Sequence, residues 1–259
     1  MAQAVPQIAE LLAPPSWRTV DFISDLHLGE LGSTSNFNAW QHYMQGTPAD
    51  AVFILGDLFE AWVGDDAVGC DEANFEDRCA RVLAQTAARV PVFFMHGNRD
   101  FLVTQSLAKR CGITLLADPT VLEFSGQRWL LSHGDALCID DLDYLRFRAQ
   151  VRSPEWQQAF LAKPLVERQA IARGLRQQSQ AHQRSSVSYA EVDAATARQW
   201  LVQARASTLI HGHTHRPAVH DLHNGLSRVV LSDWDAGASP PRAQVLRLSA
   251  SGLQHIALL

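Results

Sequence analysis

Residues 50–60 read DAVFILGDLFE, and this stretch decides the class of fold that we expect. The apolar run 51–55 is typical of a buried β-strand, and Gly56 and Asp57 end it abruptly. The same event recurs elsewhere in the chain, where an apolar run stops at a polar or glycine-containing loop. The other runs are RTVDFISDLHLG (18–29), VPVFFMHGNRD (90–100), RWLLSHGD (128–135) and STLIHGHTH (207–215).

Helical patterns separate several of these predicted strands. Residues 73–90 and 103–111 have the apolar spacing of helices, and strands that alternate with helices indicate an α/β fold with βαβ units. Three later apolar runs, 228–234, 243–249 and 253–259, have no helix between them. We therefore expect a second sheet that is partly antiparallel.

One long segment, residues 142–206, contains no convincing strand and has helical spacing throughout. Pro154 and Pro164 should break it into short helices. Residues 144–186 carry eight Lys or Arg and two acidic residues, so this part has a charge of +6 and the rest of the chain −11. The sequence thus predicts a single-domain core over 17–259 with a basic helical insertion over 142–206.

Composition excludes several classes of protein. Lys and Arg number 22 and Asp and Glu 27, and the net charge of −5 disfavours a general nucleic-acid binder. Four widely spaced cysteines without a CxxC pair are typical of a reducing compartment. Neither a membrane-spanning run nor a signal peptide is evident, so we expect a cytoplasmic protein. The sequence does not fix the oligomeric state, and a monomer is the expected form. Residues 1–16 precede the first strand and receive no role.

The polar residues that follow the five strands are unusually uniform in type. Ligands bind at the carboxyl ends of strands in α/β sheets, so these side chains should meet. They are Asp25, His27, Asp57, Asn98, His133, His213 and His215. Such oxygen and imidazole ligands suit Mn²⁺, Fe²⁺ or Zn²⁺, and seven are too many for one open catalytic ion. Two ions, with Asp57 as the bridge, would serve hydrolysis of a phosphate ester or anhydride. We expect His211 to face away from this site.

The motifs SDLHLG, GDLFE, GNRD, HGD and HGHTH, in this order, resemble those of the calcineurin-like metallophosphoesterase family over roughly residues 18–235. The resemblance implies a two-sheet αββα sandwich with a dinuclear centre. It further implies that Asp25, His27 and His215 hold the first ion. Asn98, His133 and His213 would hold the second, with Asp57 bridging the two.

The third motif narrows the expected substrate. Most of the family has GNH followed by an acidic residue, whereas this chain has Arg99 after Asn98. Arginine does not donate a proton at neutral pH, but it can hold a phosphate bidentately. The stretches GNRDFL (97–102), GDLFEAWVGDD (56–66) and HGDALCIDD (133–141) are similar to the branch of the family that acts on UDP-2,3-diacylglucosamine.

That similarity implies cleavage of the substrate's pyrophosphate, giving UMP and 2,3-diacylglucosamine 1-phosphate in lipid A biosynthesis. It also implies manganese as the metal and a peripheral position on the cytoplasmic face of the inner membrane. Asn98, Arg99 and His213 would be the catalytic residues that also touch substrate. Asp141, Ser179 and Gln183 would add substrate contacts, although the chain departs from its relatives after Ser179, where a lysine is replaced by Ser185 or Ser186.

Alternatives remain at this stage. The insertion could be an acyl-binding slot that is open to a bilayer or an ordinary lid with solvated charges. The enzyme could be another dimetal phosphodiesterase or nucleotide pyrophosphatase. A scaffold that has lost its metals would lack ligands, and none of the seven is missing here. A DNA nuclease is disfavoured by the acidic core.

Overall fold

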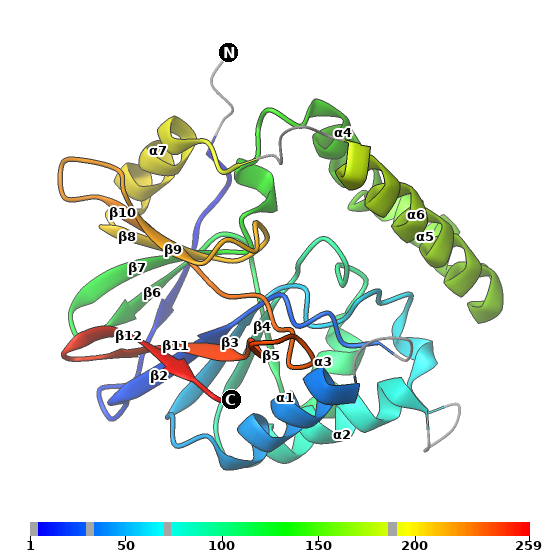
Figure 1. The fold of residues 1–259 in the computed structure, drawn as a ribbon, viewed down its shortest axis with the longest axis horizontal. Coiled ribbons are helices and arrows are strands. Elements are labelled where there is room, and N and C mark those ends of the chain that lie inside the picture. Colours follow the sequence, from blue (N-terminus) through cyan, green and yellow to red (C-terminus); the bar gives the residue numbers. More distant parts are fainter. Residues whose placement is uncertain (1–4, 30–33, 70–73, 186–190) are drawn as a thin grey trace.

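The computed structural model describes residues 5–29, 34–69, 74–185 and 191–259, without the side chains of 177–185. Two six-stranded sheets pack face to face (Figure 1). The first sheet has the order β1 (Ala9–Leu12), β6 (Thr120–Phe124), β7 (Gln127–Ser132), β8 (Thr208–His211), β10 (Ser227–Val230) and β9 (Ala218–Asp221). The second has the order β12 (Gly252–Ala257), β11 (Gln244–Ser249), β2 (Thr19–Ile23), β3 (Ala51–Leu55), β4 (Val92–Met95) and β5 (Thr114–Leu116).

Both faces of the central strands are buried, which explains their continuous apolar sequences. Along β3, Phe53 belongs to the cluster between the sheets, which also contains Leu131 of β7. Its neighbours Val52 and Ile54 belong to a second cluster, on the other face of that sheet. Three helices contribute to this second cluster: α1 (Thr34–Gly46), α2 (Phe75–Ala87) and α3 (Gln105–Cys111).

A fourth layer covers the outer face of the first sheet. There α7 (Ala194–Ala204) packs Trp200 and Leu201 against Leu130 and Leu209. The layers are therefore helix, sheet, sheet, helix, which confirms the predicted αββα sandwich. The helices predicted over 73–90 and 103–111 correspond to α2 and α3.

The segment 142–206 is helical where the structure describes it. It holds α4 (Leu142–Val151), α5 (Pro154–Leu161) and α6 (Leu165–Ser185), followed by α7. Pro154 is the first residue of α5, and Pro164 immediately precedes α6, as expected of residues that cannot continue a helix. We call residues 142–185 the helical arm, because α4, α5 and α6 lie together on one side of the molecule, apart from α7 (Figure 1).

A buried arginine fixes the helical arm to the core. Arg168 of α6 is 1% exposed, and its Nη1 donates to the Val63 carbonyl at 2.5 Å. The same guanidinium pairs with Asp66, and its Nε donates to the Lys163 carbonyl at 2.9 Å. A buried guanidinium needs such partners, so α6 is held against the loop that follows β3.

Two features of the fold differ from the expectations. The second sheet is partly antiparallel as predicted, but of the three later runs only β11 and β12 belong to it, because β10 joins the first sheet between β8 and β9. The N-terminal stretch without an assigned role contributes β1, which pairs in parallel with β6. The predicted division into a single domain over 17–259 with an insertion over 142–206 stays a prediction.

Candidate metal centre

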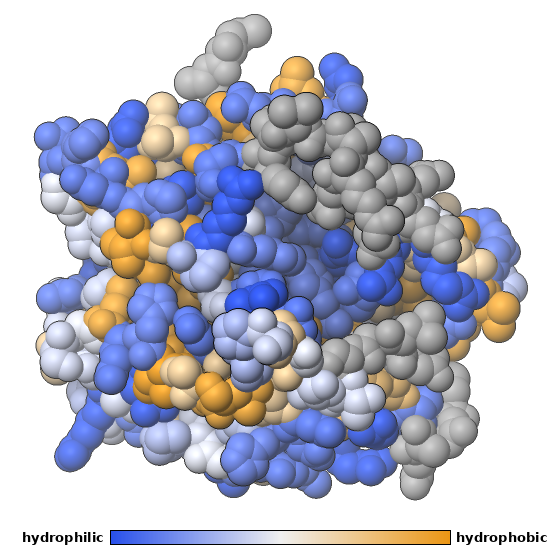
Figure 2. Space-filling model, viewed as in Figure 1, coloured by the Kyte–Doolittle hydropathy of each residue, from blue (hydrophilic) through white to orange (hydrophobic). Residues whose placement is uncertain are grey.

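The carboxyl ends of strands from both sheets meet at one edge of the sandwich. In the second sheet, β2, β3 and β4 run parallel, and Asp25, Asp57 and Asn98 follow them. In the first sheet, β7 and β8 run parallel, and His133 and His213 follow them. Figure 2 shows a hollow in the middle of one face, surrounded mostly by hydrophilic residues. The site thus lies where the strand ends of the two sheets meet.

Three of the predicted ligands form a first group. Nε2 of His27 lies 3.2 Å from Nε2 of His215, and that atom lies 3.2 Å from Oδ1 of Asp25. The ligand atoms of all three lie within 4.8 Å of one another. Asp25 is fully buried, while the side chain of His215 is 39% exposed. The group therefore opens to solvent on its imidazole side.

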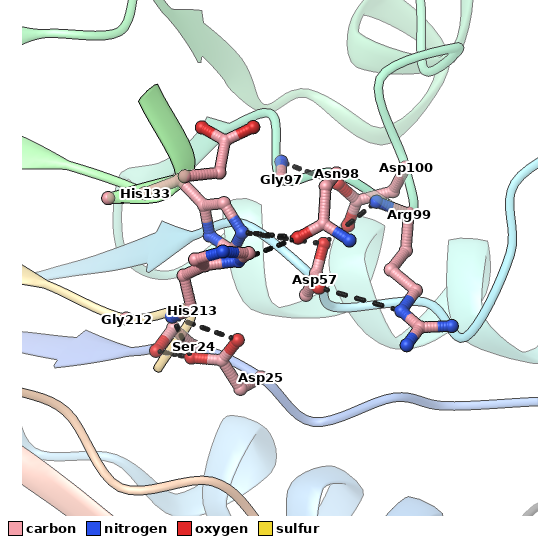
Figure 3. A network of polar contacts seen from close by, with 12 residues as sticks. Ser24, Asp25, Asp57, Gly97, Asn98, Arg99, Asp100, His133, Gly212 and His213 are labelled. Atoms are coloured by element: carbon pink, nitrogen blue, oxygen red, sulfur yellow. Dashed lines mark hydrogen bonds and ion pairs between the residues drawn. The ribbon is translucent and has the colours of Figure 1, made fainter. Parts of the chain in front are cut away.

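The remaining four predicted ligands form a second group (Figure 3). Oδ1 of Asn98 lies 3.0 Å from Nε2 of His133 and 2.9 Å from Nδ1 of His213. Nε2 of His133 is 3.7 Å from Oδ1 of Asp57, and ligand atoms of Asp25, Asp57 and His133 lie within 4.8 Å of one another. Asp25 thus reaches both groups, and the bridging role of Asp57 stays a prediction.

The backbone at five of the seven predicted ligands lies in the left-handed region. The φ angles are 55° at Asp25, 51° at His27, 52° at Asp57, 69° at His213 and 53° at His215. Residues other than glycine avoid this region, at a cost on the order of 1 kcal/mol each. Such conformations persist where the surrounding structure enforces them, and they cluster at functional sites. The loops are therefore shaped to present these side chains.

Two motif glycines leave room for ligands from other motifs. A Cβ atom on Gly97 would collide with the carboxylate and backbone nitrogen of Asp57. A Cβ atom on Gly212 would collide with the Asp25 carboxylate and with the Ser24 hydroxyl. Each glycine is thus required by a ligand that comes from a different strand end.

Burial governs the charge state of the carboxylates in this site. It raises the pKa of Asp57 to about 7. Burial alone would also raise the pKa of Asp25, but the hydrogen bond and charge of His215 hold it well below its usual range. Burial would lower the pKa of His133, yet the carboxylates of Asp57 and Asp135 raise it to about 9. The centre therefore has buried negative charge that a cation would stabilise.

Two of the other three imidazoles are arranged to act as neutral ligands; burial would lower the pKa of His215, but the hydrogen bond and charge of Asp25 raise it. Burial lowers the pKa of His27 to about 3 and that of His213 to about 4. Neutral imidazole is the form that binds metal ions. Two nitrogens on one ion, with bonds of about 2.1 Å, lie roughly 3 Å apart, which agrees with the 3.2 Å between His27 and His215. The residues present fit divalent ions.

Arg99 lies beside this site on the far side of Asp57 from His133 (Figure 3). Its backbone nitrogen donates to Oδ1 of Asp57 at 2.9 Å, and its Nη1 donates to Oε1 of Glu60 at 2.9 Å. Its side chain is 20% exposed. The guanidinium is therefore held in place and also reaches solvent, as a phosphate-binding group must.

The predicted substrate contacts on the helical arm have a different status. Asp141 caps α4, since its Oδ1 accepts from the Tyr144 nitrogen at 2.9 Å. Ser179 and Gln183 lie in α6, and their side chains are outside the described residues. Their roles toward substrate stay predictions. His211 faces away from the centre as expected, because its Nε2 lies 3.2 Å from Nη1 of the buried Arg228.

Sequence reasoning assigned no role to two buried carboxylates within the motifs. Asp100 accepts from the Gly97 nitrogen at 2.7 Å and holds the GNRD loop. Asp135 accepts from the Tyr144 hydroxyl at 2.5 Å and from Nε of Arg148 at 2.8 Å, and so ties α4 to the HGD loop. Tyr144 in turn stacks on His213, with ring centroids 5.9 Å apart. The presence of Asp100 in the GNRD motif and of Asp135 in the HGD motif was the sequence signal that could have identified these two residues.

Several known proteins are similar to this chain. The profile of the calcineurin-like phosphoesterase family matches residues 18–217. The UDP-2,3-diacylglucosamine hydrolase of Chromobacterium violaceum is 44% identical over 247 residues, covering 92% of this chain and 98% of that protein. The protein of the same name from Xanthomonas axonopodis pv. citri is 44% identical over 260 residues, covering 93% and 100%. A solved structure of an archaeal phosphodiesterase has a TM-score of 0.47 at 10% identity and covers 92% of this chain and 99% of that one.

Proposed function

The chain belongs to the calcineurin-like phosphoesterase family, and on that premise we propose that it hydrolyses UDP-2,3-diacylglucosamine. Cleavage of the pyrophosphate bond gives UMP and 2,3-diacylglucosamine 1-phosphate, a step of lipid A biosynthesis. One observation carries this proposal: relatives named UDP-2,3-diacylglucosamine hydrolase are 41–44% identical to the chain along about nine-tenths of its length. Identity of that extent supports a shared substrate as well as a shared fold.

The protein is a dimetal-type phosphoesterase with a candidate Asp and His metal site. We assign Asp25, His27 and His215 to the first ion, and Asn98, His133 and His213 to the second, with Asp57 shared. Two bound divalent ions would supply positive charge to the substrate's phosphate groups and activate water near neutral pH. We propose Mn²⁺ as the metal, although Fe²⁺ and Zn²⁺ accept the same ligands.

The chain's own residues complete the chemistry around the reacting phosphate. Arg99 would hold phosphate oxygens through its fork of N–H donors, and Asn98 and His213 would stabilise charge on the transferring group. The pKa of His213 is lowered to about 4 by burial, so it acts without a charge of its own. The sugar phosphate is a good leaving group and needs no proton donor, which agrees with an arginine at position 99.

The helical arm has the features that a lipid substrate requires. Leu142 is 60% exposed, Val166 73% and Leu175 38%, and the arm is also rich in arginine. We propose that the arm, with Asp141, Ser179 and Gln183, binds the diacylated sugar. Within the described ranges, no helix is long and apolar enough to cross a bilayer. Apolar and basic side chains on one element favour a peripheral position on the cytoplasmic face of the inner membrane.

The experiment that tests this function compares three substrates. Purified protein with Mn²⁺ in detergent is assayed with UDP-2,3-diacylglucosamine, bis(p-nitrophenyl) phosphate and UDP-glucose. Release of UMP from the lipid substrate alone, and its loss after chelation, is the expected result. Turnover of the soluble substrates without turnover of the lipid substrate would refute the proposed substrate but would still support dimetal hydrolysis.

A further inference from the structure

Glu60 lies where three parts of the site meet. It follows Asp57 by three residues, and its side chain is 15% exposed. Its Oε1 accepts from Nη1 of Arg99 at 2.9 Å and lies 2.9 Å from Nε of Arg176, which belongs to α6. Its Oε2 lies 3.7 Å from Nδ1 of His27. One carboxylate therefore contacts a predicted metal ligand, the predicted phosphate clamp and the helical arm.

The backbone holds Glu60 in this place. Its nitrogen donates to the Leu28 carbonyl at 2.8 Å, and Leu28 forms a parallel bridge with Phe59. A Cβ atom on Gly29 would lie only 3.1 Å from the Glu60 Cβ, so the two loops are in close contact. The loops that carry His27 and Asp57 thus fix the backbone of Glu60 next to the site.

The contact with His27 lies on the side of the ring away from the metal centre. Nε2 of His27 faces His215, which leaves Nδ1 on the opposite edge. Among the described residues, Nδ1 has no hydrogen-bond partner, and the Glu60 carboxylate faces it at 3.7 Å, beyond hydrogen-bond distance. The negative charge on this side of the ring favours a proton on Nδ1, which leaves Nε2 free for a metal ion.

The contacts with the two arginines share one oxygen atom. Arg99 comes from the loop after β4, and Arg176 from the helical arm, so their positive charges would otherwise repel each other. The Glu60 carboxylate between them compensates for this repulsion. Arg99 uses Nη1 here, and a guanidinium has five N–H donors in total, so others remain for a phosphate.

We propose that Glu60 is a positioning residue for the reaction described above, and the inference rests on that proposed function. It holds Arg99 and α6 next to each other beside the metal centre and places a negative charge behind the His27 ring. It contacts none of the reacting atoms itself. Its effect on the reaction is therefore exerted through Arg99, Arg176 and His27.

The test compares Glu60→Gln and Glu60→Asp with Glu10→Gln, a control that removes the ion pair between Arg128 and a glutamate of β1 whose side chain is 67% exposed. We expect Glu60→Gln to lower kcat/KM for UDP-2,3-diacylglucosamine by about tenfold to a hundredfold. Glu60→Asp should recover part of this loss, because it keeps the charge. Melting temperature and bound Mn²⁺ should stay within error of the wild type, and Glu10→Gln should match the wild type.

A double-mutant cycle separates positioning from simple charge removal. If Glu60 acts through Arg176, the losses of Glu60→Gln and Arg176→Gln will be strongly non-additive in kcat/KM. Additive losses, wild-type activity of Glu60→Gln, or a large drop in its melting temperature would each overturn the proposal. The same variants are assayed with bis(p-nitrophenyl) phosphate. If the wild type cleaves only that substrate, the proposed function fails, and the effect of Glu60→Gln on that substrate still decides the role of Glu60.

Discussion

The Nε2 atoms of His27 and His215, which are 188 residues apart in the chain, lie 3.2 Å from each other in the folded protein. The unfolded chain cannot hold these two nitrogens at such a distance. A divalent ion that binds both must therefore favour the folded state over the unfolded one. The first group of ligands thus links metal binding to the stability of the whole sandwich.

Removal of the metal should lower the melting temperature. At a free Mn²⁺ concentration about a hundredfold above Kd, binding stabilises the fold by about 2.7 kcal/mol. For a chain of this size, that raises Tm by roughly 5–10 °C over the chelated protein. Differential scanning calorimetry with EDTA and with excess Mn²⁺ measures the shift, and equal values of Tm would contradict it.

Asp57→Asn should remove the shared ligand while nearly preserving its shape. We expect fewer than two Mn²⁺ per chain by elemental analysis, and a loss of kcat of at least about a hundredfold. Asp221→Asn, whose side chain is 77% exposed, is the matched control and should keep both properties. Two bound ions together with full activity in Asp57→Asn would show that this carboxylate is not a bridge.

Arg99→Lys keeps the charge and removes the fork of donors. If the guanidinium holds phosphate oxygens bidentately, kcat/KM should fall by about a hundredfold while bound Mn²⁺ is unchanged. Arg110→Lys makes the same change at an arginine of α3 whose side chain is 53% exposed, and should behave as the wild type. If Arg99→Lys had wild-type kinetics, Arg99 would contribute only its positive charge and not bidentate hydrogen bonds.

Metal binding should release a proton from His133. Its Nδ1 lies 2.9 Å from the Leu55 carbonyl and its Nε2 3.0 Å from Oδ1 of Asn98, so both nitrogens face acceptors. Nearby carboxylates raise its pKa to about 9, so at pH 8 this proton must leave before the nitrogen can bind. Titration calorimetry in buffers of different ionisation enthalpy should show about one proton released per chain, and an apparent affinity that falls below pH 9. Heats that do not depend on the buffer would refute this.

Asp135→Asn should loosen the attachment of α4. Burial alone would raise the pKa of Asp135, but the guanidinium groups of Arg148 and Arg152 hold it well below 3.8. Its contribution is therefore present above pH 3.8 and is lost as the pH falls through the lower folded value. At pH 7 we expect a loss of about 3 kcal/mol in urea unfolding, and a smaller difference in strong acid. Asp143→Asn, whose side chain is 94% exposed, should change stability by less than about 0.5 kcal/mol.

Short-range patterns were enough to predict an α/β fold and the seven candidate ligands, and the family resemblance supplied the αββα layers. A buried strand such as 51–55 has an apolar sequence, and the polar residue after it must lie at the strand's carboxyl end. That logic holds for each strand by itself, so Asp25, Asp57 and Asn98 could be placed without any knowledge of pairing. The family motifs then supplied the grouping into two ions.

Long-range pairing was beyond this reasoning. The register of a strand such as β10 depends on hydrogen bonds to β8 and β9, and nothing in its own sequence selects one sheet over the other. The role of Asp135 depends on Tyr144 and Arg148, which a helix brings to it from further along the chain. Glu60 likewise gains its meaning from Arg176, more than a hundred residues away.

The steric fit between the motif glycines and predicted metal ligands from other motifs has a consequence for protein engineering. Gly97 makes space for Asp57, and Gly212 makes space for Asp25, so each of these loops is sterically complementary to a loop from another strand. A loop transplanted from a distant homologue would have a different shape and would not fit the loop that it contacts here. Grafting one motif into this scaffold should therefore fail unless the complementary motif is exchanged at the same time, and libraries that vary the loops in matched pairs should yield more active clones than libraries that vary them singly.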